Sequence, residues 1–356
     1  MRILFDGFWW SRGPFSNQQV LREFIFAWER EFAQDELVVA VPTRNVAAAR
    51  VEIPERVRLV QTRLRPQGIS AILELPVLAT VHGADWILTH NFSPIFGRSA
   101  VFVHDLIFVT NPGWFTRAER AYFSLMPATL SRARHIFTSS STEAVRIDSV
   151  GRGRRAAVPV GLSIPPGLTH AELAPVPGLH GLEGFVLVVG RLNVRKNLEI
   201  ALQGALLSKT IRPQLPVIVV GEPSGRVSEL PFAVTEAMSN GTIKFTGFIS
   251  DQQLAWLYSR ARLFLFLSLD EGFGIPNLEA LSFGTPVLAS DIPVFREILR
   301  TNAAFVDPRD VKAVASAVDA ALADESRLEP IDPATLGFSW AQSVRKIRAV
   351  LMQTGQ

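Results

Sequence analysis

The chain has 356 residues, 48% of them hydrophobic and 19% charged, so it can bury the apolar surface of about two domains and cannot be largely disordered. It has no cysteine, which excludes a disulfide scaffold, a cysteine nucleophile and thiolate metal sites and predicts a reducing, cytoplasmic location. The net charge of +3 rests almost wholly on arginine, which favours contact with phosphate, and no run approaches the roughly 20 apolar residues of a membrane span.

In the first half of the chain, short apolar runs alternate with segments of helical periodicity. The predicted strands cover 2–8, 36–42, 57–62, 86–91, 100–105 and 135–140. The clearest helix lies over 16–32, where apolar residues recur on one face and Ser16 or Asn17 can cap the first turn. This alternation indicates repeated βα units on a parallel sheet.

A Pro- and Gly-rich stretch at 164–184 interrupts the pattern and predicts a linker. Beyond it the alternation resumes, with strands predicted over 185–192, 216–222, 243–248, 263–268, 286–291 and 303–308. Two helices, over 310–323 and 339–354, close the chain. The predicted fold class is α/β, with two Rossmann-like, doubly wound parallel-sheet domains whose strand-to-helix loops face a central cleft.

The segment DEGFGIPNLEALSFGTPVLASD (270–291) follows a predicted buried strand and carries two carboxylates around a glycine turn. Gly272, Gly274 and the first turn of the following helix offer N–H groups to a negatively charged ligand. Glu271 and Glu279 cannot bind an anion, but they can accept hydrogen bonds from sugar hydroxyls. A nucleotide sugar has both kinds of group, although a glycine turn with a capping glutamate has the same spacing.

The segment GRLNVRKNLEIAL (190–202) joins the first predicted strand of the second half to a helix. Arg191, Arg195 and Lys196 lie in this loop, where cations beside free helix N–H groups can neutralise a diphosphate. Lys196 is also the only lysine before position 209. Three close positive charges repel one another, so an anionic ligand explains them economically, and a solvated basic turn is the alternative.

The motif G-R-x-x-x-x-K-N, followed about 75 residues later by E-G-F-G-I-P-N-L-E, resembles the donor half of GT-B glycosyltransferases, specifically glycosyltransferase family 4. That family's E-x7-E spacing runs here from Glu271 to Glu279. The resemblance spans nearly the whole chain and implies a GT-B fold and a retaining reaction. The domains it implies are an N-terminal acceptor domain over 1–165, a linker over 166–184, a nucleotide-sugar donor domain over 185–335 and, over 336–356, a C-terminal helix packing back on the N-terminal domain.

The resemblance also implies roles for individual residues. Arg191 and Lys196 would hold the donor diphosphate. Glu271 would contact hydroxyls of the transferred sugar, and Glu279 would bind the nucleotide ribose. Arg191, Lys196 and Glu271 are therefore expected to be catalytic, together with His104. The remaining donor-binding residues would line the sugar and phosphate with their backbone, and they are Gly190, Gly272, Phe273, Gly274 and Ile275.

In the N-terminal half, VFVHDLIF (101–108) matches the H-D-L that follows the corresponding strand in mannosyl- and rhamnosyl-type members of the family. This implies that His104 contacts the donor sugar or its phosphate across the cleft, although a single His at a strand end is also often structural. The loop WWSRGPFSNQQ (9–19) stands in the place of the family's glycine-rich loop, which implies that Gly13 approaches the diphosphate.

The sequence predicts neither a metal nor a cofactor. No Asp-x-Asp occurs and the six His show no ligand spacing, so neutralisation of the diphosphate is expected from Arg191, Lys196 and helix dipoles. The predicted enzyme is a metal-independent hexosyltransferase. By the H-D-L resemblance it moves mannose from GDP-mannose to a saccharide or lipid-linked acceptor in surface polysaccharide or glycolipid synthesis.

The acceptor leaves weaker signals in the sequence. Phe15 and Trp114 can form an aromatic platform or belong to a core. The segment 116–135 mixes arginines with apolar residues at helical spacing, which fits either a peripheral position at the inner face of the cell membrane or a solvated helix face. Nucleic acid is not an expected partner, because no predicted helix apart from the segment 146–155 has a clustered basic face.

Two further functions fit the same pattern of elements. A nucleotide-sugar epimerase of the same fold would need acids and a His around the sugar, and a two-domain sugar-binding protein would need no catalytic set. The first apolar stretch contains Asp6, so no secretory signal is predicted, which counts against a periplasmic binding protein.

Overall fold

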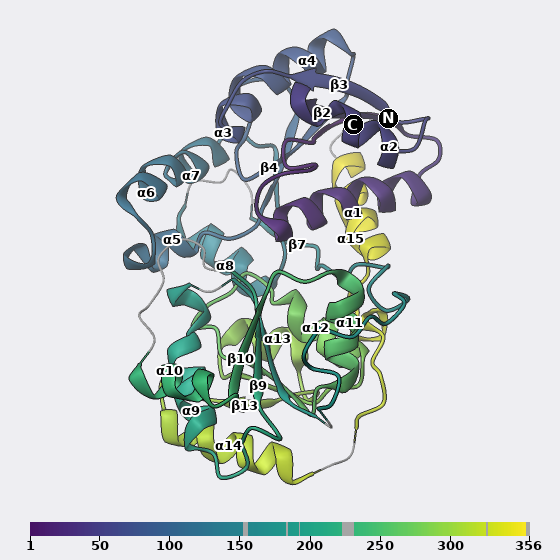
Figure 1. Cartoon of the computed structure of the whole chain (residues 1–356). Coiled ribbons are helices and arrows are strands. Elements are labelled where there is room, and N and C mark those ends of the chain that lie inside the picture. The colour runs from purple at the N-terminus through teal and green to yellow at the C-terminus, as the bar shows by residue number, and fades with distance from the viewer. Residues whose placement is uncertain (152–155, 183, 192, 223–230, 325–326, 354–356) are drawn as a thin grey trace. The chain divides into compact units, whose positions relative to one another are not determined.

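The computed structural model describes residues 1–151, 156–182, 184–191, 193–222, 231–324 and 327–353. The chain divides into two compact units (Figure 1). The first contains residues 1–110, 117–162 and the C-terminal segment from Gly337, and the second contains 111–116 and 163–336. Each is an α/β unit built on one parallel sheet.

The first unit has a seven-stranded sheet with the order β3-β2-β1-β4-β5-β6-β7. Its strands are β1 (Arg2–Asp6), β2 (Glu36–Pro42), β3 (Arg58–Thr62), β4 (Trp86–His90), β5 (Ser99–Val103), β6 (His135–Thr138) and β7 (Val158–Pro159). Its helical elements are α1 (Phe15–Glu31), η1 (Thr43–Asn45), α2 (Val46–Glu52), α3 (Gln67–Ile69), η2 (Ser70–Glu74), α4 (Leu75–Val81), α5 (Ile107–Thr110), α6 (Arg117–Phe123), α7 (Leu125–Leu130), α8 (Ser141–Ser149) and α15 (Trp340–Gln353).

The second unit repeats this arrangement with a six-stranded sheet of order β10-β9-β8-β11-β12-β13. Its strands are β8 (Val186–Val189), β9 (Val217–Val220), β10 (Ile243–Gly247), β11 (Leu263–Phe266), β12 (Val287–Ser290) and β13 (Ala304–Val306). Its helical elements are η3 (Pro112–Trp114), η4 (Val194–Lys196), α9 (Leu198–Leu207), α10 (Phe232–Ser239), α11 (Asp251–Arg260), α12 (Ile275–Ser282), α13 (Pro293–Leu299), α14 (Val311–Ala323) and η5 (Pro333–Leu336).

In both sheets the strand order reverses beside the first strand, between β1 and β4 and between β8 and β11. Such a reversal opens a crevice outside the carboxyl ends of the strands, where open parallel sheets bind their ligands. In the second unit the core beneath that edge is apolar, with Leu202 of α9, Val219 of β9, Leu265 of β11 and Val318 of α14 fully buried. The loops after β1, β4, β8 and β11 therefore lie where such sheets bind their ligands.

The C-terminal helix α15 belongs to the first unit, where it lies beside α1 (Figure 1). The Trp340 ring meets the Phe24 ring of α1 edge to face, with 5.8 Å between centroids. Arg348 donates from Nε to Asp35 Oδ2 at 2.8 Å. An aromatic contact with α1 and a charged pair with the turn that follows α1 thus hold the end of the chain in the first unit.

The predicted α/β class with two parallel sheets is confirmed, and every predicted strand overlaps a strand of the structure. The predicted strands mostly extend too far, because the polar residues at their ends already belong to loops. His104 and Asp105, for example, follow β5. The sequence does not predict β7, since two residues are too few to show a period.

The stretch predicted as a linker, 166–184, lies in the second unit. Leu168, Val176 and Leu179 are buried there, and the Ala174 N–H donates to a carbonyl of α11 at 3.2 Å. This stretch therefore forms turns, as its Pro and Gly content predicts, and those turns pack on the unit. Parts of four predicted segments, residues 152–155, Glu183, Leu192 and Thr354, lie outside the described residues.

No helix among the described residues is both long and apolar enough to cross a bilayer.

Candidate functional site

The loop after β8 starts from a closely packed edge of the sheet. Gly190 leaves β8 with φ +149°, and Gly221 follows β9 with φ +139°. A Cβ atom on Gly221 would lie 1.9 Å from the Gly190 carbonyl oxygen. Only glycine permits this approach, so the backbone of the predicted donor-binding residue Gly190 is fixed by its neighbour.

Two asparagines shape the rest of this loop. Asn193 accepts a hydrogen bond from the Lys196 N–H at 3.2 Å and so caps η4. Asn197 adopts a left-handed conformation with φ +53° and donates from Nδ2 to the Pro308 carbonyl at 2.7 Å. Because asparagine tolerates this conformation, the chain can turn into α9 directly after Lys196. The backbone on both sides of Lys196 is thereby fixed, and with it the position from which the Lys196 side chain extends.

The side chain of Lys196 meets Glu271, which lies 75 residues further along the chain. Lys196 Nζ donates to Glu271 Oε1 at 2.6 Å, and Arg195 Nη1 pairs with Glu271 Oε2. The Lys196 ammonium also lies 4.4 Å from the centroid of the Phe266 ring, within reach of a cation–π contact. The two predicted motifs therefore form one charged cluster in the second unit, which we call the Glu271 cluster: Arg191, Arg195, Lys196 and Glu271.

Burial and charge oppose each other in this cluster. Burial would raise the pKa of Glu271, but the charges of Arg195 and Lys196 outweigh it and hold that pKa at about 2. Burial lowers the pKa of Lys196, an effect that Glu271 opposes and that Arg195 and Arg191 reinforce. Glu271 is therefore ionised at neutral pH between Arg195 and Lys196, and the charge of Arg191 acts on Lys196 in turn. Such an excess of positive charge suits a phosphate group.

The turn after Glu271 leads into α12 through Gly274, which has φ +96° and is the N-cap of the helix. A Cβ atom on Gly274 would lie 2.7 Å from Phe295 Cε1, so conformation and space both exclude a larger residue. Phe273 and Ile275 on either side are buried. Together with Gly272, the predicted donor-binding turn is therefore closely packed and begins next to the charged cluster.

Glu279 lies in the second turn of α12 and is 6% exposed. Its Oε2 accepts a hydrogen bond from the Tyr258 hydroxyl at 2.9 Å. Burial raises the pKa of Glu279 to about 7, with a further rise from the charge of Asp251, while the hydrogen bond from Tyr258 lowers it. The two glutamates of the motif thus differ: Glu271 is ionised by its cationic partners, whereas Glu279 is partly protonated at neutral pH.

In the first unit, His104 follows β5 and pairs with His90 at the end of β4. His90 Nδ1 and His104 Nε2 lie 3.1 Å apart, so one proton lies between the two rings. Asn91, with φ +65°, accepts from the His104 N–H through Oδ1 at 3.1 Å. Burial lowers the pKa of His104 to about 3 and that of His90 well below its ordinary value. Both rings are therefore neutral at pH 7.

Gly13 lies in the loop between β1 and α1 and has φ +121°. A Cβ atom on Gly13 would lie 2.0 Å from Cε3 of the Trp9 ring. Gln18 donates from Nε2 to the Gly13 carbonyl at 2.8 Å, so the loop turns back over Trp9 before α1 begins. The turn itself therefore requires glycine at position 13, and this requirement does not depend on ligand binding.

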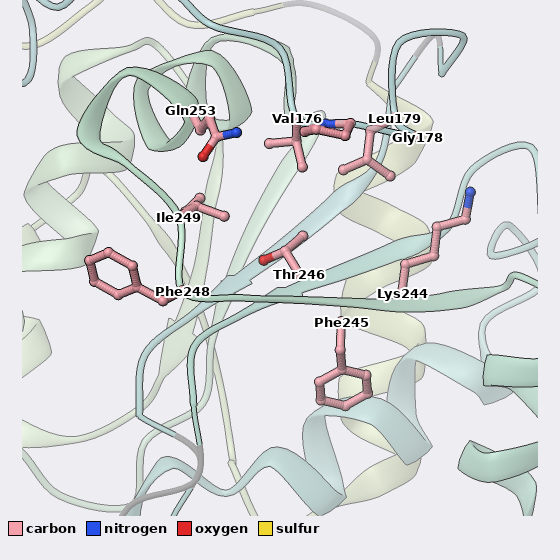
Figure 2. Close-up of a pocket in the computed structure, with 10 residues that line it drawn as sticks. Val176, Gly178, Leu179, Lys244, Phe245, Thr246, Phe248, Ile249 and Gln253 are labelled. Carbon is pink, nitrogen blue, oxygen red and sulfur yellow. The ribbon is translucent and has the colours of Figure 1, made fainter.

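A cavity of about 490 Å³ lies at another place in the second unit, beside the edge strand β10 (Figure 2). Figure 2 shows Lys244 and Thr246 on one side of that strand and Phe245 on the other, where Phe245 packs on the core. The lining residues are Val176, Pro177, Gly178, Leu179, Lys244, Phe245, Thr246, Phe248, Ile249 and Gln253. Among the described residues, its lining includes none of the predicted site residues.

The structure brings Arg191, Lys196 and Glu271 together, and it places Glu279 on the adjoining helix with a different partner. His104 and Gly13 belong to the first unit. The roles given to all these residues remain predictions.

Two partners of the predicted site residues have no assigned role at the level of the sequence, whereas Arg195 is already among the three cations predicted to neutralise a diphosphate. His90 ends the strand next to that of His104, and strand order would reveal it. Tyr258 is 21 residues before Glu279 on another helix, and no local pattern points to it.

Two Rossmann-like parallel-sheet domains, each with its candidate residues at the carboxyl ends of the strands, define the GT-B fold class. The crystal structure of WaaG, a glycosyltransferase involved in lipopolysaccharide biosynthesis, superposes with a TM-score of 0.67 and 16% identity, covering 99% of this chain and 100% of WaaG. Residues 172–335 match the family described as glycosyl transferases group 1, and the two units together have the GT-B fold.

Several relatives of the chain are mannosyltransferases. O-antigen chain mannosyltransferase B of Escherichia coli is 29% identical over 273 residues, which are 73% of this chain and 70% of that protein. The GDP-mannose:cellobiosyl-diphosphopolyprenol alpha-mannosyltransferase of Xanthomonas campestris is 27% identical over 274 residues, 73% of this chain and 70% of that protein. The serotype-specific mannosyltransferase WbdA of Escherichia coli is 31% identical over 166 residues, so the chain spans 20% of its length. These matches support a glycosyltransferase.

Proposed function

We propose that this protein is a retaining glycosyltransferase of family 4 that transfers mannose from GDP-mannose to a saccharide or lipid-linked acceptor in the synthesis of a surface polysaccharide or glycolipid. The observation that carries the proposal is the contact between Lys196 and Glu271, because it joins the loop predicted to bind the diphosphate to the carboxylate predicted to bind the sugar. The names of the Escherichia coli and Xanthomonas campestris relatives support mannose as the sugar, and the latter supports GDP-mannose as the donor.

The charged residues of the Glu271 cluster can contact different parts of the donor. Arg191 and Lys196 would contact the diphosphate, whose negative charge grows as the bond between the sugar C1 and the phosphate oxygen breaks. Glu271, kept ionised by Arg195 and Lys196, would accept hydrogen bonds from sugar hydroxyls. Arg195 then acts through Glu271, as a positioning residue. Glu279 would accept from a ribose hydroxyl.

The reaction needs no protein nucleophile. The new bond forms between C1 and the acceptor oxygen on the face from which the phosphate departs, and the acceptor proton passes to the departing phosphate oxygen. His104 would contact the sugar as a neutral ring, because burial lowers its pKa to about 3. A neutral imidazole can donate or accept a hydrogen bond without repelling the positive charge that develops on the sugar.

We further propose that transfer needs neither a metal ion nor a cofactor. The three cations of the Glu271 cluster supply the charge that a divalent ion would otherwise bring to the diphosphate. Transfer that persists in excess chelator would support this proposal, and loss of transfer that added Mg²⁺ restores would contradict it.

A peripheral position at the cytoplasmic face of the membrane belongs to the same proposal. The described part of the first unit exposes Leu73, Val77 and Val81 on one helical segment, with Ile95 and Phe96 after β4. Arg132 donates to the Ile95 carbonyl at 3.2 Å, and exposed apolar side chains beside an arginine are typical of proteins that bind anionic lipid surfaces. Co-sedimentation with anionic vesicles, absent with neutral vesicles, would support this position.

The proposal is tested by incubating the purified protein with a panel of nucleotide sugars, with and without saccharide and lipid-linked acceptors. We expect GDP release from GDP-mannose only when an acceptor is present, and an α-linked product from the α-linked donor. Isomerised sugar without acceptor would indicate an epimerase. Binding without turnover of any pair would indicate a sugar-binding protein.

A further inference from the structure

The first unit carries a second set of cations, which the proposed reaction leaves unused. Arg12 lies in the loop between β1 and α1, Arg44 follows β2 and Arg65 follows β3, and all three are exposed. Because β1, β2 and β3 are neighbours in a parallel sheet, their carboxyl ends meet at one edge. The three arginines thus come from consecutive loops at the ligand-binding edge of the unit.

Hydrogen bonds between these loops hold them to one another. The Gly7 N–H donates to the Ala40 carbonyl at 2.7 Å, which ties the start of the Arg12 loop to β2. The Thr43 hydroxyl donates to the Thr62 carbonyl at 3.2 Å, which ties the next loop to the end of β3. The charges therefore stand on joined backbone segments and cannot separate freely.

Within the described part of the chain, none of the three guanidinium groups makes a hydrogen bond or an ion pair. The carboxylate of Glu74 lies at the Arg65 loop, but it accepts hydrogen bonds from the backbone N–H groups of Arg63 and Leu64. The pKa of Arg44 is lowered, first by partial loss of hydration and then by the charges of Arg65 and Arg12. Guanidinium groups held close together without a carboxylate partner attract a polyvalent anion, and their planar donors match phosphate oxygens.

We infer that Arg12, Arg44 and Arg65 bind a phosphate or diphosphate group of the acceptor. The assignment to the acceptor rests on the proposed function, in which the Glu271 cluster of the second unit already holds the diphosphate of the donor. A hexose phosphate and a lipid-linked diphosphate saccharide present the same oxygens to the arginines. These arginines would therefore bind the phosphorylated end of an acceptor, and the hydroxyl group that reacts would lie away from them.

The first test needs no catalysis. Binding of inorganic pyrophosphate is measured by calorimetry with the donor site blocked by saturating GDP or UDP. We expect the wild type to bind it and the R44A/R65A variant to bind about ten-fold more weakly, whereas R50A, which removes an exposed arginine of α2, matches the wild type. The variants change exposed side chains and should stay folded. No binding by the wild type, or equal binding by all three proteins, would overturn the inference.

The second test uses transfer kinetics with a hexose 1-phosphate, a short-chain lipid diphosphate saccharide and the same saccharide without phosphate. In R44A/R65A we expect KM to rise about ten-fold for a phosphorylated acceptor, with kcat and the KM for the donor unchanged. The acceptor that shows this rise identifies the source of the phosphate. A raised KM for the donor instead would overturn the inference. If no acceptor is turned over, the proposed function fails, and pyrophosphate binding still decides whether the anion site exists.

Discussion

The two units share one topology but treat charge at their strand ends in opposite ways. In the second unit Lys196 and Glu271 are both largely buried and form an ion pair, and the charges of Arg195 and Lys196 hold the pKa of Glu271 at about 2. In the first unit the corresponding edge buries His90 and His104, and burial is the main cause that lowers the pKa of both, that of His104 to about 3. A buried group stays ionised where an opposite charge pairs with it and becomes neutral where none does.

Because of this difference, the two edges suit different chemical groups of a ligand. A site that keeps ionised cations suits the diphosphate of a donor, whose charge changes during the reaction. A site with neutral rings suits hydroxyl groups, which need donors and acceptors but no net charge. Four variants examine the contrast, and we take them from the largest expected effect to the smallest.

Removing Lys196 examines the charged edge directly. We expect K196A to lower kcat/KM about 100-fold or more, because a preorganised donor is lost where negative charge develops. The protein should stay folded, since Arg195 still pairs with Glu271. Steady-state kinetics and a thermal unfolding curve measure the two properties. The control is K209A, which removes an exposed lysine of the same unit. Wild-type turnover by K196A would end the assigned role and, with it, the contrast.

Glu279 is a carboxyl group that is buried in the second unit and has no cationic partner among the described residues. Its pKa is about 7 in the folded state against an ordinary value of 4.5, so between these pH values the folded protein holds a proton that the unfolded chain has lost. Its contribution to stability is therefore complete below about pH 4.5 and is lost as the pH rises through 7. We expect E279Q to remove about 2 kcal/mol of this decline.

Chemical unfolding at pH 5 and pH 8 measures the decline in the wild type and in E279Q, with E236Q as an exposed control from the same unit. The difference between the wild type and E279Q isolates Glu279 from other acids with a raised pKa, such as the partly buried Glu23, whose pKa also rises to about 7. If E279Q and the wild type lose the same free energy of unfolding between these pH values, Glu279 is ionised like Glu271 and the distinction between the two glutamates is lost.

Much of the fold follows from the sequence, because apolar period and turn residues act locally. The strand pattern predicts both parallel sheets, and the two glycine and basic segments predict where the charged cluster forms. What the sequence does not predict depends on contacts between distant segments. The hydrogen bond from Tyr258 to Glu279 and the pairing of His90 with His104 depend on which helices and strands become neighbours. The protonation states follow from those contacts, so they also need the structure.

The histidine pair examines the neutral edge. The pKa of His104 is about 3 against an ordinary 6.5, so between these values the unfolded chain binds a proton that the folded protein does not, and stability falls as the pH drops below 6.5. We expect H90L to reduce this loss by about 1 kcal/mol between pH 7 and pH 5, since His90 also has a lowered pKa. Transfer should fall about ten-fold, because His104 Nε2 loses its partner.

Nitrogen-15 spectra of the His104 ring distinguish this positioning role from a loss of packing. In the wild type the shared proton should give His104 one dominant tautomer, and H90L should change that distribution. H180L, which removes an exposed histidine, is the control. An unchanged His104 spectrum in H90L, together with reduced activity, would mean that His90 acts through packing alone.

The smallest expected effect concerns a polar group that is buried without a partner. Asn277 lies in the first turn of α12, between the two glutamates of the motif, and is 0% exposed, yet neither polar atom of its side chain has a hydrogen-bond partner among the described residues. An unsatisfied buried amide costs about 1–3 kcal/mol, so we expect N277L to raise the free energy of unfolding by about 1 kcal/mol. T89V is the matched change in the first unit, where the Thr89 hydroxyl is likewise buried without a partner. If the Asn277 amide binds the donor, N277L should gain stability and lose donor affinity, whereas T89V should gain stability alone. Equal activity in both variants would mean that Asn277 lowers stability without contributing to donor binding.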